Sequence, residues 1–230
     1  MEARSLKNYG KSLLEMMGNL PPEVIKAVSD LTSEIMAQAL GAEKMEQLAS
    51  SLPEEKEKML QLDMSAVHEK GLGSKEFICQ QIEWAASFSL ISHMMTKGVT
   101  VEVLRKAAEQ AYPKLFSALF PTPGELRESD DPFAAFKEWF SAMMDANRKA
   151  GLFDYEVAED NQDALQINCT WCAWYEIYKQ AGVKAACIPV CHADDAFYPN
   201  YLRQTGIRYK RTKTLGWGDD CCDFRFEREK

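Results

Sequence analysis

Cysteine side chains gather in the last third of this chain. The sequence has seven cysteines in 230 residues, and six of them lie at or after Cys169. They form three groups: Cys169 and Cys172 in a Cys-Thr-Trp-Cys run, Cys187 and Cys191 four positions apart, and the adjacent pair Cys221 and Cys222. Thiolates are strong nucleophiles and ligands of soft metals. The sequence therefore concentrates its potential chemistry here.

Three interpretations of these thiols compete. A structural zinc site needs four nitrogen or sulfur ligands, and the run from Cys169 to Cys172 supplies only half of one, with no second run of this kind. A redox dithiol needs only Cys169 and Cys172, but the pattern around them is not thioredoxin-like. Free cysteine is most often a small buried apolar residue. Packing alone accounts poorly for six thiols within residues 169–222.

Two carboxylates follow one of the thiols at helical spacing. Asp194 and Asp195 come three and four positions after Cys191, so on a helix both could approach its thiol. A carboxylate there could act as a general base, orient water or bind a metal, and the plain alternative is a solvated helix end. His192 adjoins Cys191 but points about 100° away on a helix. We expect His192 to pair with a thiol from another segment.

One positive patch stands out in an acidic protein of net charge −8. It consists of Arg203, Arg208, Lys210, Arg211 and Lys213. An arginine pointing inward from a strand could bind a substrate carboxylate through two hydrogen bonds, whereas the lysines are typical of a charged strand edge. The acidic net charge and the scarcity of interleaved aromatic residues argue against nucleic-acid binding.

The elements that must position these residues change type along the chain. Apolar residues at helical spacing predict helices over the first seventy residues, from Ser74 to Met95, from Thr100 to Pro121 and from Asp131 to Gly151. Alternating residues then predict two strands, at 153–157 and 165–167. Helices follow at about 171–180 and 185–202. Cys169 and Cys172 thus lie where a strand meets a helix N-terminus, which favours thiolate and predicts a lowered thiol pKa.

The end of the chain predicts a β-hairpin, with strands at 207–214 and 222–226 around a Gly216-Trp217-Gly218 turn. Alternation puts Cys222, Phe224 and Phe226 on one face. Helices first and an antiparallel hairpin last predict an α+β fold: N-terminal helices, then a helical layer on a small antiparallel sheet. We expect two parts, a helical extension at 1–72 and an α+β domain at 73–230.

The composition limits the class of protein. Apolar residues make up 46% and charged residues 27%, as in ordinary globular proteins. No apolar run reaches the roughly 18 residues of a membrane span, and the N-terminus lacks an apolar signal core. We expect a cytoplasmic protein with reduced thiols that does not bind membranes, and a homodimer is compatible with its helices.

The C-terminal third resembles the L-2-amino-thiazoline-4-carboxylate hydrolase family. The matching blocks are Asn168-Cys169-Thr170-Trp171-Cys172, Cys191-His192-Ala193-Asp194, Arg211-Thr212-Lys213-Thr214, Gly218 and Cys222-Asp223-Phe224-Arg225. The strong resemblance spans about residues 165–226, a looser one reaches back to about 75, and the first seventy residues lie outside it. Cys169, Cys187 and Cys221 are additional to the family pattern.

The resemblance implies hydrolysis of a small cyclic amidine-like substrate that carries a carboxylate, to give an N-carbamoyl-cysteine-like product. The implied catalytic residues are Cys172, Cys191, Asp194, Cys222 and Asp223, with Cys172 or Cys191 as nucleophile and Asp194 as base. The implied substrate-binding residues are Arg211, which would bind the carboxylate, with Thr214, Asn168 and His192. This reaction requires no cofactor.

A second hypothesis is a non-catalytic protein that binds a metal or a small molecule as a sensor. Cys172, Cys191 and Cys222 could together hold zinc or an iron–sulfur cluster with one open position. A dithiol redox protein that uses Cys169 and Cys172 is a third.

Overall fold

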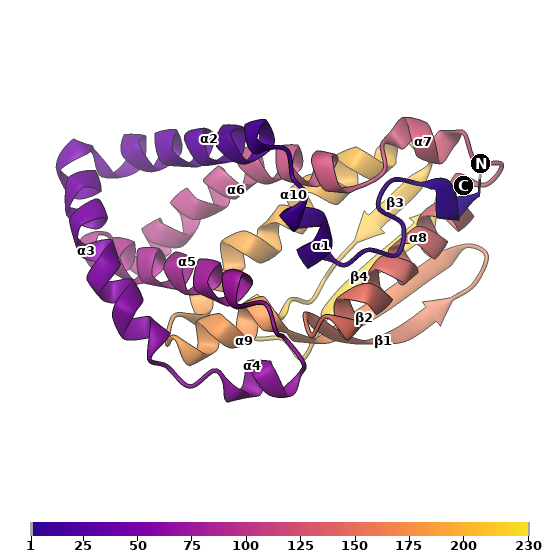
Figure 1. The fold of residues 1–230 in the computed structure, drawn as a ribbon. Coiled ribbons are helices and arrows are strands. Elements are labelled where there is room, and N and C mark those ends of the chain that lie inside the picture. Colours follow the sequence, from indigo (N-terminus) through magenta and orange to yellow (C-terminus); the bar gives the residue numbers. More distant parts are fainter. Residues whose placement is uncertain (1, 230) are drawn as a thin grey trace.

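Residues 2–229 are described by a computed structural model, and this part of the chain folds into ten α-helices and a four-stranded sheet (Figure 1). The helices are α1 (Leu13–Gly18), α2 (Pro22–Leu40), α3 (Ala42–Leu60), α4 (Ser65–Glu69), α5 (Lys75–Met94), α6 (Lys97–Leu119), α7 (Pro123–Arg127), α8 (Pro132–Lys149), α9 (Ala173–Gln180) and α10 (Cys187–Arg203). Within residues 2–229, no helix combines the length and the apolar character that crossing a membrane requires.

The strands form one antiparallel sheet. They are β1 (Phe153–Asp160), β2 (Ala164–Cys172), β3 (Ile207–Lys210) and β4 (Cys222–Arg228), in the order β1-β2-β4-β3. β3 and β4 pair antiparallel as the predicted hairpin, but β3 ends at Lys210 and not at 214 as predicted. A short 3-10 turn, η3 (Leu215–Trp217), lies in the loop between them. The predicted α+β class is confirmed, with a mainly helical chain and its sheet built from the C-terminal half.

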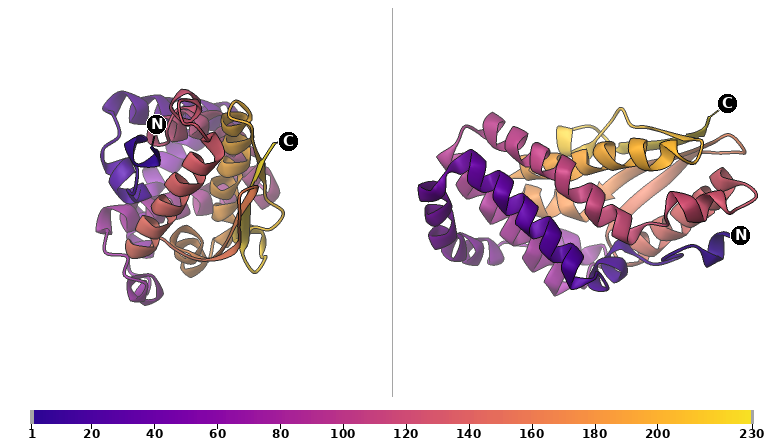
Figure 2. Two further views of the ribbon diagram at one scale, coloured as in Figure 1. Left: turned by 90° about the vertical axis from the view of Figure 1, so that its right-hand side faces the viewer. Right: turned by 90° about the horizontal axis from the view of Figure 1, so that it is seen from above.

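Helices cover one face of the sheet, which lies at one side of the molecule (Figure 2). The ring of Phe226 on β4 is fully buried there. It packs against Phe136 and Phe140 of α8, with ring centroids 4.9 and 4.7 Å away, and against Tyr198 of α10 at 5.5 Å. The alternation predicted for β4 is therefore confirmed, because Phe226 and Phe224 both face the core and its cavity.

Local sequence signals fix where two of the long helices begin. The Ser74 side chain accepts a hydrogen bond from the Phe77 N–H and begins α5, and the Asp131 side chain accepts one from the Ala134 N–H and begins α8. Pro132 at the first helical position of α8 costs no hydrogen bond, because that N–H has no partner inside a helix.

The N-terminal helices lie along the later ones. α2 packs against α6 and α3 against α5 (Figure 1). Met36 and Met59 from the first seventy residues share a buried cluster with Phe77 and Ile82 of α5. The division into parts at residue 72 stays a prediction, and the apolar core runs across it.

Gly151 packs closely against the backbone at the boundary between these two parts. It adopts φ +70°, and a Cβ there would lie 2.4 Å from the backbone nitrogen of Leu72. We expect Gly151→Ala to lower the free energy of unfolding by roughly 2–4 kcal/mol, through backbone strain and this overlap. Gly182→Ala is the matched control, because Gly182 has φ +72° but open space around it. Urea unfolding should show that Gly182→Ala lowers the free energy of unfolding by only about 1 kcal/mol. Equal losses at both positions would contradict the overlap between residue 151 and the Leu72 backbone.

Candidate functional site

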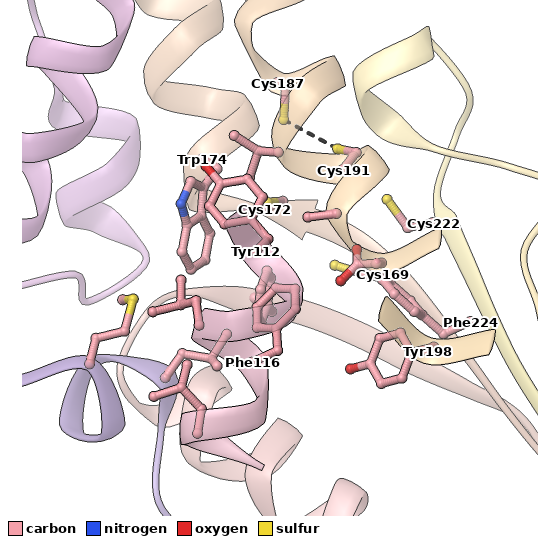
Figure 3. Close-up of a pocket in the computed structure, with 18 of the residues that line it drawn as sticks. Tyr112, Phe116, Cys169, Cys172, Trp174, Cys187, Cys191, Tyr198, Cys222 and Phe224 are labelled. Atoms are coloured by element: carbon pink, nitrogen blue, oxygen red, sulfur yellow. Dashed lines mark hydrogen bonds between the residues drawn. The ribbon is translucent and has the colours of Figure 1, made fainter. Parts of the chain in front are cut away.

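A mostly apolar cavity of about 340 Å³ lies between the helices and the sheet. Its walls come from α1, α5, α6, α8, α9 and α10 and from β1, β2 and β4. Five of the seven cysteines line it (Figure 3): Cys169, Cys172, Cys187, Cys191 and Cys222. The fold thus brings together one member or more of each of the three thiol groups seen in the sequence.

Backbone geometry explains this convergence. Cys169 on β2 lies directly opposite Cys222 on β4 in the sheet register. Cys187 and Cys191 are one turn apart on α10, and their Sγ atoms are 3.5 Å apart. The η3 turn packs closely on α10, because a Cβ on Gly216 would lie only 3.1 Å from the Cys191 Sγ. Gly216 therefore allows the loop between β3 and β4 to close over the thiols.

The predicted lowering of the thiol pKa is wrong. Cys172 does precede α9, and the backbone N–H groups of Trp174 and Tyr175 do lower its pKa, but burial dominates and raises it to about 12. Burial likewise raises the pKa values of Cys169 and Cys222 well above the ordinary value. An apolar environment penalises the thiolate more than the helix N-terminus stabilises it. These side chains are therefore thiols at neutral pH.

This protonation predicts slow alkylation. A pKa of about 12 leaves Cys172 almost no thiolate at pH 7, so we expect iodoacetamide to label it at least about 100-fold more slowly than free cysteine. Peptide mass spectrometry measures the rate at each cysteine, and the same protein in urea is the control for reagent access. Labelling of folded Cys172 at the rate of free cysteine would contradict the effect of burial.

Arg211 and two carboxylates form the charged end of the cavity. The Arg211 side chain is only 2% exposed and follows β3. Its Nη1 donates to Asp194 at 2.9 Å, and its Nη2 donates to Asp195 and to the Cys191 carbonyl, both at 2.6 Å. Tyr209 also donates to Asp195, at 3.3 Å. The guanidinium therefore fixes the position of both carboxylates on α10.

Asp194 combines access to the cavity with a shifted pKa. It lines the cavity together with Arg211. Burial and the neighbouring Asp195 raise its pKa, Arg211 opposes them, and the balance lies at about 6. A carboxyl group that titrates near neutral pH can accept a proton and return it within one reaction. The role of Asp194 as a base stays a prediction.

The comparisons with known proteins add one decisive match. The family model described as L-2-amino-thiazoline-4-carboxylic acid hydrolase matches residues 6–226. The chain belongs to this family. The match also covers the N-terminal helices, which the sequence resemblance left outside the family. No curated protein and no solved structure gave a significant match.

The N-terminal part of the family match contributes to the cavity. Leu13 and Met17 of α1 line it together with residues of the C-terminal third. The helical region of this family member is therefore part of the cavity wall, which the sequence pattern of the first seventy residues did not indicate.

The arrangement of the cysteines does not point to a metal site. In the described part of the chain, no group of three or more histidine, cysteine, aspartate or glutamate residues is arranged to hold a metal ion. The hypothesis that Cys172, Cys191 and Cys222 bind zinc or an iron–sulfur cluster is therefore not supported by the arrangement of their side chains. These thiols share a wall of the cavity without the arrangement of a ligand set.

Two predicted substrate-binding residues lie away from the cavity lining. His192 points to α6, where its Nε2 lies 2.6 Å from the Glu109 carboxylate, so it does not pair with a thiol. Asn168 sits on β2 next to the cavity-lining Cys169, and its side-chain oxygen accepts a hydrogen bond from Gln166. The alternation of β2 explains this, because neighbours of Cys169 point to the other face of the sheet.

Asp223 and Thr214 shape the loop that covers the thiols. The Asp223 carboxylate accepts hydrogen bonds from the backbone N–H groups of Thr212 and Lys213, at 2.7 and 2.6 Å, and from the Thr212 hydroxyl. These bonds outweigh burial and lower its pKa. Thr214 is fully buried, and its N–H donates to Asp219 at 2.7 Å. Both residues position the loop, and neither is among the residues that line the cavity.

Sequence reasoning missed the aromatic part of the site. Tyr198 lines the cavity four residues after Asp194, so helical spacing on α10 could have indicated it. Tyr112 and Phe116 of α6 also line it (Figure 3). Their sequence environment carries no signal, because only the packing of α6 against α10 brings them to the thiols.

Proposed function

We propose that this protein hydrolyses a small cyclic amidine-like compound of the L-2-amino-thiazoline-4-carboxylate type. The observation that carries the proposal is Asp194, a carboxyl group with a pKa of about 6 that is fixed by Arg211 at the end of an apolar cavity. Family membership supports the same reaction class. The exposed edge of Asp194 supplies an acceptor for the N–H groups of a cyclic amidine.

The reaction needs one base that also acts as an acid. Asp194 takes a proton from water as the water oxygen attacks the ring carbon between nitrogen and sulfur. As the oxygen adds, the π electrons of the carbon–nitrogen double bond move to the ring nitrogen. The carbon–sulfur bond then breaks, its electron pair stays on sulfur, and Asp194 returns the proton to that sulfur. The second proton of the water moves from the added oxygen to the ring nitrogen, which leaves a carbonyl group. One water is consumed, and the product is N-carbamoyl-cysteine. A group with a pKa of about 6 suits both transfers near neutral pH.

Arg211 holds Asp194 in place and has further N–H donors for the substrate. A guanidinium has five N–H donors. Three of them bind Asp194, Asp195 and the Cys191 carbonyl, which leaves two without a partner among residues 2–229. We infer that these two bind the substrate carboxylate, as the family resemblance implies for Arg211. The substrate would then lie with its carboxylate on Arg211 and its amidine on Asp194.

The thiols take a different role from the one predicted for Cys172. A nucleophilic thiolate is costly at Cys172, because burial raises its pKa to about 12. Cys191 is the thiol nearest in sequence to the base, one helical turn before Asp194, and it is the candidate for covalent catalysis. We propose direct attack by water, with the thiols forming a soft apolar wall beside the ring sulfur.

Incubation of the purified protein with L-2-amino-thiazoline-4-carboxylate tests the proposal. Mass spectrometry should detect N-carbamoyl-cysteine at many turnovers per protein molecule. In water labelled with ¹⁸O, a single turnover should place the label in the product, and Cys191→Ser should retain activity within about tenfold of wild type. If Cys191→Ser is inactive and an adduct can be trapped on Cys191 of the wild-type protein, the Cys191 thiol and not water is the nucleophile. Tight binding without turnover would instead favour the sensor hypothesis.

A further inference from the structure

The cavity is larger than the ring compound that the family name specifies. A protein cavity of about 150 Å³ holds benzene, at roughly 25 Å³ per heavy atom. L-2-amino-thiazoline-4-carboxylate has about nine heavy atoms, so at this ratio it would leave roughly a third of the 340 Å³ cavity empty. Unfilled apolar space forfeits contacts with its walls, which weakens binding.

The two ends of the cavity differ in chemistry. Asp194 and Arg211 are the only charged side chains among the described residues that line it. The rest of the lining is uncharged and mostly apolar. It includes Leu13 and Met17 from α1, Leu115 and Phe116 from α6 and Met143 from α8, and its amide side chains are Gln80 and Gln81 of α5. Figure 3 shows Phe116 and Trp174 across the cavity from Cys222. One polar end therefore continues into an apolar region, which we call the apolar arm.

The lining of the apolar arm fits a flat aromatic group. Phe116 is already within ring-contact distance of its neighbours, at 5.1 Å from Phe197 and 6.1 Å from Tyr112. Aromatic groups favour edge and offset contacts with such rings, and methionine side chains adapt to their shape. The arm offers no charged partner, so a second charged group on the ligand would be buried there without compensation.

From these features we propose that the preferred substrate carries one aromatic ring, of five or six atoms, as a substituent on a ring whose N–H groups face Asp194. The substituent fills the apolar arm while the reacting carbon lies beside Asp194 and the thiols. The reaction in this inference rests on the proposed function. The class of ligand rests on the cavity alone.

The test compares two compounds, 2-amino-thiazoline-4-carboxylate and its 5-phenyl derivative. We expect kcat/KM to be at least about tenfold higher for the phenyl compound, because even one methylene in an apolar pocket is worth about that factor. Leu115→Phe and Leu13→Phe should each reduce this ratio toward or below one, since both fill the arm. Val157→Phe is the control for a new aromatic group, because Val157 is exposed on β1, and it should leave the ratio unchanged.

Calorimetry separates this inference from the proposed function. An equal or higher kcat/KM for the unsubstituted compound would overturn the aromatic substituent and leave the hydrolase intact. If neither compound is hydrolysed but the phenyl compound binds at least about tenfold more tightly, the ligand class stands and the proposed reaction fails. If the phenyl compound neither reacts nor binds, the inference is wrong whatever the other compound does.

Discussion

Asp194→Asn should lower kcat by about 10²–10³-fold while leaving the fold intact, because the amide keeps the shape and the acceptor oxygen for Arg211 but cannot carry a proton. KM should rise as well, because the amide NH2 cannot accept the hydrogen bonds that we propose for the amidine N–H groups, so kcat is the measure of the lost proton transfer. The rate of product formation, followed by mass spectrometry, measures the effect. Near-normal activity in a folded Asp194→Asn variant would remove this carboxyl group from the mechanism.

Asp195→Asn is the matched control. Asp195 lies on the same helix and binds the same guanidinium, at 2.6 Å, but it is not among the described residues that line the cavity. We expect its loss to reduce kcat by less than about tenfold. If both variants lose activity equally, the carboxylates act only by holding Arg211, and the base must be sought elsewhere.

The pH profile gives a second measure of Asp194. Its pKa of about 6 predicts that kcat/KM falls about tenfold per pH unit below pH 6. Asp195 contributes to raising that pKa, so Asp195→Asn should move the acid limb to lower pH. A limb that does not move would mean that another group controls it.

The protonation of Asp194 should also make the free energy of unfolding depend on pH. The folded-state pKa of Asp194 lies above its ordinary value of 3.8, so the folded protein holds the proton more tightly than the unfolded chain. The stabilisation is full below about pH 4 and is lost as the pH rises through 6. Asp194→Asn should remove this part of the pH dependence of unfolding.

Some of this site could be predicted from periodicity. The spacing of Cys191 and Asp194 predicted one helix face, and both residues line the cavity. Alternation along the last strand predicted that Cys222 and Phe224 share a face, and both contribute to the same wall. Such inferences succeed because the side-chain direction in a helix or strand depends on local geometry alone.

Properties that depend on tertiary burial could not be predicted in this way. The helix N-terminus at Cys172 was visible in the sequence, but the burial that raises its pKa to about 12 was not. Asp223 was placed in the site by resemblance, although its carboxylate is used by the backbone of Thr212 and Lys213. The contribution of Met17 and Phe116 depends on how α1 and α6 pack against distant elements.

Arg211→Met should produce the largest loss of stability among these substitutions, about 3–5 kcal/mol at pH 8. Arg211 is the cation that pairs with both Asp194 and Asp195, whose side chains are 24% and 29% exposed. Methionine fills most of the volume but leaves two neighbouring carboxylates without their partner, which is the costly case for a buried ion pair. Urea unfolding measures the loss, and Arg208→Met is the control. Arg208 is exposed on β3, and its replacement should cost within about 0.5 kcal/mol.

The dependence on pH separates charge from packing in this variant. Protonated carboxyl groups need no cation, so the loss in Arg211→Met should shrink as the pH falls toward 5. Adding Asp194→Asn and Asp195→Asn to Arg211→Met removes the uncompensated charges, and it should recover much of the stability although the site then has three substitutions. The alternative is that Arg211 stabilises the protein through packing on Phe224, whose ring centre lies 5.4 Å from the guanidinium carbon, and not through its charge. In that case the loss of stability would be the same at pH 5 and pH 8 and would persist in the triple variant.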